Sequence, residues 1–277
     1  LAVRLRVWVT QGLRVLDTMP LGLGRLVGTV VASGGFDSEP ERVAREYWEG
    51  TGRRAAPNGS LMRTHPLGVM CLFRGEREAF ELAARMSRVT HVDPSPEGGL
   101  ENLKLDDPAA MGYVYKTLGS GVVLLRMAMR RTAASRGGLL DRTRLFEHLI
   151  TDLIMRGGDA DTNACFAGAL LGGYLGYSFL PDHWKHGLKH GEWLLAKTDA
   201  LCQVLGLKDG KYIGSEDQDT ELHGGRPVIS QDEMEGRWMV LQQATFKKMQ
   251  ETEKATSSRP TGSGWSLPWH SKEKKKR

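Results

Sequence analysis

The sequence predicts an all-α protein, because hydrophobic residues recur at three- and four-residue steps along most of its length. The opening segment shows the pattern, with Leu5, Trp8, Val9 and Leu16 on one face of a helix. Segments that are rich in β-branched residues and alternate with polar residues, as strands require, are scarce. Both observations favour helices packed on helices.

Helices are expected over eight segments that are bounded by proline, glycine or polar residues. These are residues 5–19, 40–48, 76–88, 111–130, 145–155, 161–177, 183–205 and 234–249. Pro20 follows the first segment, and Pro40 begins the second, where a missing N–H is harmless. Asp106 and Asp107 are expected to open the 111–130 helix by capping it, although such a pair could imitate a metal site.

The composition changes after residue 207, which predicts three regions. Residues 1–207 are expected to form a helical domain. Residues 208–230 are polar and rich in Gly, Asp and Glu, which is typical of a linker or wrapping segment, and with the following helix they make up a second region, 208–250. Residues 251–277 are rich in Ser, Thr, Gly and Lys and are expected to form a disordered basic tail.

Length and charge limit the classes of protein to which this sequence can belong. The 277 residues suffice for one sizeable core, and 40% hydrophobic with 26% charged residues is typical of globular proteins. The net charge is +5, but residues 271–277 hold five basic side chains and one Glu, so the remainder is nearly neutral. A nucleic-acid partner would depend on residues 272–277, with Trp265 and Trp269 stacking on bases, and is disfavoured. The sequence contains no apolar run of about 18 residues, so no membrane-spanning helix is expected.

Cys71, Cys165 and Cys202 lack the spacing of zinc or disulfide sites. We expect buried free thiols, which favour a reducing compartment. The chain is therefore expected in the cytoplasm, or in the nucleus if the basic tail is a localisation signal.

The most informative segment is residues 157–162, Gly-Gly-Asp-Ala-Asp-Thr. Asp159, Asp161 and Thr162 place two carboxylates and a hydroxyl at a glycine turn that opens a helix. Such oxygens are hard ligands suited to Mg²⁺ or Mn²⁺. Helix capping is the alternative, but it needs only one of these residues and leaves Asp159 crowded by a like charge. Spacing alone leaves the two interpretations balanced.

The helix after this turn is rich in small residues. They are Ala164, Ala167, Gly168, Gly172, Gly173 and Gly176. Glycine costs about 1 kcal/mol relative to alanine inside a helix. Several together predict a central helix that its neighbours approach closely.

A second segment, residues 54–68, contains Asn58-Gly59-Ser60 followed by Arg63. Asn58 and Gly59 favour positive φ, and Ser60 is placed to begin a helix. The N–H groups of such a turn can hold phosphate, with Arg63 adding charge, whereas a plain connection from loop to helix is the simpler alternative. His91, in a third segment at 87–94, is on its own more often structural than a ligand.

In this order, the three segments resemble the ADP-ribosylglycohydrolase family, and among it the fungal members. The matching residues are Asn58, Gly59, Ser60, Met62 and Arg63; Thr90, His91, Asp93 and Pro94; and Gly157, Gly158, Asp159, Asp161 and Thr162. The resemblance covers about residues 1–207 and implies a compact orthogonal multi-helix bundle.

The resemblance also implies an activity. The family member would be a monomeric, Mg²⁺-dependent hydrolase that cleaves the bond between ADP-ribose and a modified protein side chain or small molecule. Asp159 and Asp161 would be catalytic and, with Thr162, would bind metal in a site for two Mg²⁺ ions, with Mn²⁺ as a substitute. The residues that would bind ADP-ribose or an ADP-ribosylated protein are Asn58, Gly59, Ser60 and His91.

Two departures from the family pattern indicate an incomplete site. The family's Thr-Asp-Asp metal-binding element, with its nearby Glu, is not matched, because Asp17 is the only acid before residue 37. Residues 95–99, Ser-Pro-Glu-Gly-Gly, replace a helix that the family has after the His91 segment. We therefore expect an N-terminally truncated chain that binds Mg²⁺ weakly, with a non-catalytic ADP-ribose-binding protein as the alternative.

Overall fold

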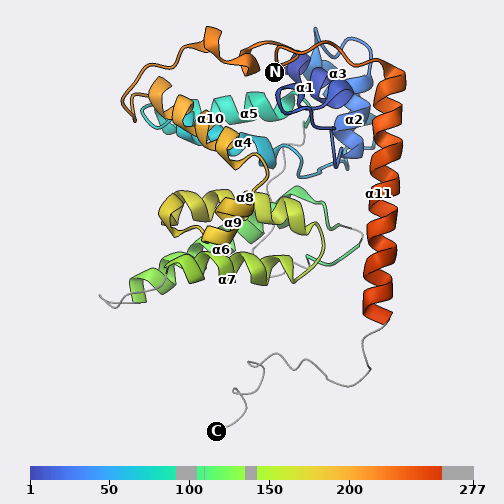
Figure 1. The fold of residues 1–277 in the computed structure, drawn as a ribbon. Helices are drawn as coiled ribbons and strands as arrows, with labels where there is room; N and C mark the ends of the chain where they lie inside the picture. The colour runs from blue at the N-terminus through green and yellow to red at the C-terminus, as the bar shows by residue number, and fades with distance from the viewer. Residues whose placement is uncertain (92–104, 109, 135–141, 258–277) are drawn as a thin grey trace. The chain divides into compact units, whose positions relative to one another are not determined.

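The structure, a computed structural model, describes residues 1–91, 105–108, 110–134 and 142–257, and these residues form helices and no strands (Figure 1). The predicted all-α fold is confirmed. Within the described residues, β-type pairing is limited to two isolated bridges, Leu13 with Thr18 and Pro57 with Tyr113. The chain divides into two compact units, Leu1–Pro227 and Val228–Arg277.

The N-terminal part of the first unit has its own hydrophobic core. Helices α1 (Ala2–Gln11), α2 (Arg25–Ala32) and α3 (Pro40–Gly50) surround it. The buried members of this core are Ala2, Leu26, Val30, Val31, Phe36, Val43 and Ala44. Pro40 begins α3, as predicted.

The first helix ends at Gln11, earlier than the predicted end near Met19 and Pro20. Gly12 has φ +75°, and a Cβ at this position would lie 2.0 Å from the carbonyl oxygen of Thr18. The chain therefore turns at Gly12, and a 3₁₀ turn at Arg14–Leu16 takes the place of the last helical turn. The error came from reading apolar spacing across a glycine that the backbone uses for a bend.

The second core lies between three helices that run side by side (Figure 1): α6 (Val114–Ala134), α7 (Arg142–Ile154) and α8 (Ala160–Leu175). Its buried members are Leu105, Leu124, Ala128, Leu145, Phe146, Leu149, Ile150, Leu153, Ala167, Leu171 and Leu175. Helices α7 and α8 match the predicted segments within a few residues. Helix α8 is in contact with α4, α6 and α7, so the prediction of a central helix is confirmed.

The glycines of α8 are not where neighbours come close. Nothing lies within 4 Å of a Cβ built on Gly172, Gly173 or Gly176. The close approach comes instead from Gly121 of α6, where a Cβ would lie 2.6 Å from Cδ1 of Phe166 on α8. The small-residue pattern thus predicted a central helix, but the closest approach depends on a glycine of α6 and not on the glycines of α8.

Helix α6 begins later than expected. Residues 105–108 and 110–113 form turns, and the Val114 N–H donates to the Ala56 carbonyl at 3.0 Å. Asp106 and Asp107 therefore do not cap this helix, because the chain makes another turn after Pro108. Asp107 lies 3.9 Å from the ammonium group of Lys116.

Four further helices complete the first unit. They are α4 (Leu61–Met70), α5 (Glu76–Arg88), α9 (Asp182–Gly187) and α10 (Gly191–Val204). The predicted single helix over 183–205 is two helices, because His190 has left-handed backbone with φ 62°. Ser60 directly precedes α4, as predicted.

Within the first unit, residues 208–227 wrap against helices α1 and α10. Asp219 accepts a hydrogen bond from Trp193 Nε1 at 2.9 Å, and Lys197 forms ion pairs with Asp217 and Asp219. On the other side, the Arg4 guanidinium donates to the Asp219 carbonyl at 2.7 Å. Of the two predicted alternatives, the structure has a wrapping segment that is held by α1 and α10.

The second unit contains helix α11 (Gln231–Ser257). It is longer than the predicted 234–249 and continues past residue 251, where the disordered tail was expected to start. The rest of that tail, residues 258–277 with Trp265, Trp269 and the basic cluster at 272–277, lies outside the described residues.

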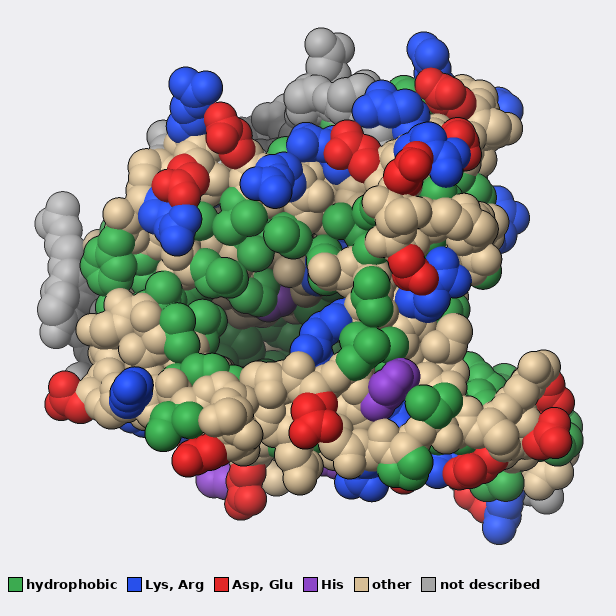
Figure 2. Space-filling view, turned by 90° about the horizontal axis from the view of Figure 1, so that it is seen from above, with side chains coloured by type: hydrophobic (Ala, Val, Ile, Leu, Met, Phe, Trp, Pro, Cys, Tyr) green, Lys and Arg blue, Asp and Glu red, His purple; other side chains and the backbone are tan. Residues whose placement is uncertain are grey.

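The surface carries charges of both signs. On the face drawn in Figure 2, acidic and basic side chains lie next to one another around a hollow lined by hydrophobic side chains. Many are neighbours along one helix, such as Arg42 with Glu46 and Arg77 with Glu81. Exposed pairs of this kind contribute little stability, about 0–1 kcal/mol each, but they leave little net charge locally.

Two smaller expectations concern thiols and membranes. All three cysteines are free, but only Cys71 is buried, since Cys202 is half-buried and Cys165 is exposed. In the described part of the chain, no helix has both the length and the apolar character needed to cross a bilayer.

The core of α6, α7 and α8 predicts a large cost for Leu171→Ala. Leu171 is fully buried, so its truncation should lower the free energy of unfolding by about 2–5 kcal/mol through lost burial and a cavity. Leu188→Ala is the matched control, because that side chain is 52% exposed, and we expect a change of about 0.5 kcal/mol or less. Urea denaturation measures both, and equal losses would contradict the assigned core.

Candidate functional site

The acidic turn is shaped by two glycines with left-handed backbone, Gly157 (φ 73°) and Gly158 (φ 70°). A Cβ on Gly158 would lie 1.9 Å from the carbonyl oxygen of Leu105, so only glycine fits there. Asp159 follows as the residue before α8, and its carboxylate makes no capping hydrogen bond. The capping interpretation therefore fails for Asp159. Asp161, which is exposed, accepts the Thr162 N–H at 2.9 Å.

Asp159 is instead bound from the side by Asn58. The Asn58 amide nitrogen donates to Asp159 Oδ2 at 2.6 Å, across 101 residues of sequence. The Asn58 backbone is held as well, because its N–H donates to the Gly112 carbonyl at 3.1 Å. Two of the three predicted segments therefore meet in one site.

The two carboxyl groups titrate together. Burial raises the pKa of the Asp159 carboxyl, an effect that hydrogen bonds from Asn58 and Thr162 oppose. A hydrogen bond with Asp159 lowers the pKa of the Asp161 carboxyl. Burial thus favours the protonated form of Asp159, and the bond to Asp159 favours the ionised form of Asp161. Two oxygens that compete for a proton are suited to a hard cation, which would neutralise both carboxylates.

The turn at 58–60 differs from its prediction in two ways. Neither Asn58 nor Gly59 has positive φ. Glycine is required at 59 by space, since a Cβ would lie 3.2 Å from Nε2 of His91. Ser60 is buried at the start of α4 and makes no side-chain capping bond there. Asn58 is also buried and its N–H is occupied, so this turn is not an exposed phosphate cradle.

His91 lies at the end of a short hydrogen-bonded chain. Arg63 donates to Thr90 Oγ1 at 2.6 Å, and Thr90 Oγ1 lies 2.7 Å from His91 Nδ1. The Thr90 hydroxyl accepts from Arg63 and either donates to His91 Nδ1 or accepts from it, depending on the His91 tautomer. His91 Nε2 is buried and has no hydrogen-bond partner among the described residues.

Burial lowers the pKa of both ionisable groups in this hydrogen-bonded series, His91 and Arg63. It lowers the pKa of His91 to about 3, with the nearby Arg63 charge adding to the effect, so this imidazole is neutral at pH 7. It also lowers the pKa of Arg63 to about 10. Arg63 donates to the carbonyls of Met86 and Ser87 at the end of α5, at 3.2 and 3.4 Å. Through its Nη2 nitrogen Arg63 supports the local fold, whereas its Nε has no hydrogen-bond partner among the described residues.

The structure brings most of the predicted residues together at the 58–60 turn. Asn58 contacts Asp159 on one side, and Gly59 faces His91 on the other. Asp93 and Pro94 of the third segment lie outside the described residues. Two polar residues behind Asn58 were missed: Thr117 on α6 and Asn163 on α8. The only available signal was that Asn163 directly follows the acidic motif.

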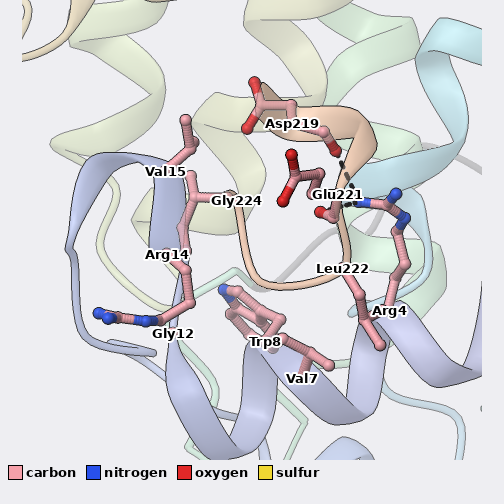
Figure 3. A pocket seen from close by; sticks show the side chains of 11 residues that line it. Arg4, Val7, Trp8, Gly12, Arg14, Val15, Asp219, Glu221, Leu222 and Gly224 are labelled. Carbon is pink, nitrogen blue, oxygen red and sulfur yellow. Dashed lines mark hydrogen bonds between the residues drawn. The ribbon is translucent and has the colours of Figure 1, made fainter. Parts of the chain in front are cut away.

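A separate pocket of about 140 Å³ lies between α1 and the wrapping segment (Figure 3). Arg4 and Trp8 line it from α1, and Asp219 and Glu221 line it from the opposite side. Ligand sites for molecules of drug size span about 300–1,000 Å³, so this pocket is too small for ADP-ribose. None of the predicted site residues lines it.

Comparison with known families gives one match. A family model described as ADP-ribosylglycohydrolase matches the chain in two stretches, residues 1–100 and 95–211, which together span most of the 277 residues. The two stretches meet at residues 95–100, within the part that the structure does not describe. No curated protein and no solved structure gives a significant match.

The turn before α8 predicts that Gly158→Ala is destabilising. The added methyl group would collide with the Leu105 carbonyl in a backbone conformation that alanine disfavours, so we expect a loss of about 1–3 kcal/mol. Gly173→Ala, inside α8 with open space around it, should instead gain up to about 1 kcal/mol from helix propensity. Thermal and urea denaturation compare the two. Tolerance of Gly158→Ala would mean that the turn is built differently.

The buried His91 predicts a specific pH dependence of stability. Its pKa is lower in the folded chain than in the unfolded chain, so below about pH 6.5 the unfolded state binds the extra proton. The stability contribution of neutral His91 is therefore complete above pH 6.5 and falls toward pH 3, by up to about 1.4 kcal/mol per pH unit. His91→Gln should flatten the pH profile of unfolding in this window. The same change at the exposed His186 should leave the wild-type slope, and identical profiles for both variants would refute buried neutrality.

Proposed function

Because the chain belongs to the ADP-ribosylglycohydrolase family, whose shared chemistry is the hydrolysis of ADP-ribose linkages, we propose a specific site for that chemistry. ADP-ribose binds at the 58–60 turn, between His91 and the acidic turn at 157–162. The bond that is cleaved joins ADP-ribose to a protein side chain or to a small molecule. A divalent cation, Mg²⁺ or Mn²⁺, assists at Asp159, Asp161 and Thr162.

The observation that carries this proposal is the hydrogen bond between Asn58 and Asp159. It joins two segments that are 101 residues apart in the sequence. The resemblance links one of them to ADP-ribose binding and the other to metal binding. Asp159 precedes α8 but caps none of its backbone N–H groups. A half-buried carboxyl held by a buried amide is a costly arrangement that a binding site explains.

The oxygens of Asp159, Asp161 and Thr162 fit one side of a Mg²⁺ coordination sphere. They are hard ligands from neighbouring residues, and a cation would offset the repulsion between the two carboxylates. When bound, the cation supplies positive charge that orients ribose hydroxyl groups and stabilises the departing group. The remaining positions would be filled by water or by the substrate, so we expect weak binding of the cation alone.

The chain's own residues would supply orientation. His91 offers the Nε2 of a neutral imidazole beside Gly59, and a substrate hydroxyl group placed there would satisfy a buried nitrogen that otherwise lacks a partner. Gly59 keeps the space in front of this nitrogen free. Asn58 holds Asp159 in a fixed orientation, which limits the reorganisation that cleavage would require.

A second candidate is an ADP-ribose-binding protein that does not cleave. One observation favours it: no cluster of three or more His, Cys, Asp or Glu side chains suited to a metal occurs in the described part of the chain. Two carboxylates and one hydroxyl give a cation few protein ligands. In this case Asn58 and His91 would still bind the nucleotide sugar, but turnover would be absent.

Metal binding and turnover separate the two candidates. Calorimetry with ADP-ribose, with and without Mg²⁺, is combined with hydrolysis assays on ADP-ribosyl-arginine and ADP-ribosyl-serine peptides. Asp159→Asn and Asp161→Asn should each weaken Mg²⁺ binding by at least about tenfold and abolish turnover. Asp199→Asn is the matched control, because Asp199 is an exposed helix residue paired with Lys208, and it should behave as wild type.

The outcomes are distinct. Mg²⁺-dependent turnover that both variants lose supports the hydrolase. ADP-ribose binding without turnover, unaffected by Mg²⁺, supports the non-catalytic candidate. Absence of ADP-ribose binding under both conditions overturns both.

A further inference from the structure

Behind Asn58 lies a chain of buried hydrogen bonds that belongs to none of the three motifs. The Asn58 amide nitrogen donates to Thr117 Oγ1 at 2.8 Å, and Thr117 Oγ1 donates to Asn163 Oδ1 at 2.7 Å. Thr117, on α6, and Asn163, on α8, are both fully buried. The chain therefore connects the site to the two helices of the main core.

The single proton of the Thr117 hydroxyl fixes the direction of this chain. That proton goes to Asn163 Oδ1, so toward Asn58 the Thr117 oxygen can only accept. Asn58 must then present its NH₂ group and not its carbonyl. One of the two amide protons goes to Thr117 and the other to Asp159 Oδ2, so both are used.

Asn163 occupies its position at a cost. Its Nδ2 is buried and has no hydrogen-bond partner among the described residues. An unsatisfied buried donor costs about 1–3 kcal/mol, so packing alone would favour an apolar side chain. What Asn163 contributes is its oxygen, which is the acceptor that orients Thr117.

We propose that Thr117 and Asn163 are positioning residues that hold the Asn58 amide with its NH₂ group toward Asp159. Without them, the Asn58 amide is free to rotate by about 180° and to place its carbonyl oxygen against the Asp159 carboxylate, where the two repel. The ligand oxygens of the acidic turn are thereby oriented from the core before any ligand arrives. The effect on cation binding rests on the proposed function, but the series of hydrogen bonds can be tested separately.

The test compares Thr117→Val with Thr117→Ser. Valine keeps the shape of threonine and removes the hydroxyl, whereas serine keeps the hydroxyl and loses a methyl group. Ser120→Ala is the control, because Ser120 is another buried hydroxyl of α6, one turn further on, and it bonds only to the Thr117 carbonyl. Two readouts are used: the side-chain NH₂ resonances of Asn58 by ¹⁵N NMR, and Mn²⁺ affinity by electron paramagnetic resonance.

We expect Thr117→Val to shift the Asn58 resonances and to weaken Mn²⁺ binding about 10–100-fold, as loss of an outer hydrogen-bond partner does at metal sites. Thr117→Ser and Ser120→Ala should stay within about twofold of wild type. If Thr117 served packing alone, serine would not rescue Mn²⁺ binding, because serine keeps the hydroxyl proton but lacks the methyl group. Unchanged Asn58 resonances in Thr117→Val overturn the proposal.

A measurement on the wild-type chain keeps the proposal testable if Thr117→Val does not fold. Both Asn58 side-chain amide protons should exchange with deuterium at least about tenfold more slowly than those of the exposed Gln242. Equal exchange overturns the proposal. Slow exchange and shifted Asn58 resonances without Mn²⁺ or ADP-ribose binding in the wild type would leave the positioning role intact and overturn the proposed function instead.

Discussion

The hydrogen bond from Asn58 to Asp159 is the interaction on which the candidate site depends. It exists because two turns are forced into fixed shapes: residues 56–58 pair with 112–114, and Gly158 lies against the Leu105 carbonyl. The first turn is fixed by two backbone hydrogen bonds, and the second by the close contact of Gly158 with a carbonyl group. The side chains of the site are thus placed by main-chain geometry, and helix packing then keeps the two turns together.

The site draws on parts of the molecule with separate structural roles. The acidic turn belongs to the core of α6, α7 and α8, whereas His91 belongs to the end of α5, where Arg63 binds the last carbonyls of that helix. The 58–60 turn leads into α4, which contacts both α5 and α8. The two parts approach each other at Gly59, which follows Asn58 in the sequence and faces the His91 ring.

Sequence patterns predicted the helical class, most helix positions and the three segments that meet in the site. They failed where the backbone departs from regular geometry: at Gly12, at His190 and before Val114. They also missed Thr117 and Asn163, because a buried polar residue in a helix looks like any surface residue when only spacing is read. For Arg63, local chemistry suggested an anion ligand, and only the packing of α5 revealed its structural partners.

The contact between Gly121 and Phe166 has a consequence for how this protein can vary. The aromatic ring sits where a side chain on α6 would otherwise be, one turn along α8 from Asn163. Any substituent at 121 would push α8 along or away from α6, and the two carboxylates at the start of α8 would move with it. The distance between these carboxylates and Asn58 is therefore set in part by the glycine at position 121, which leaves room for the Phe166 ring.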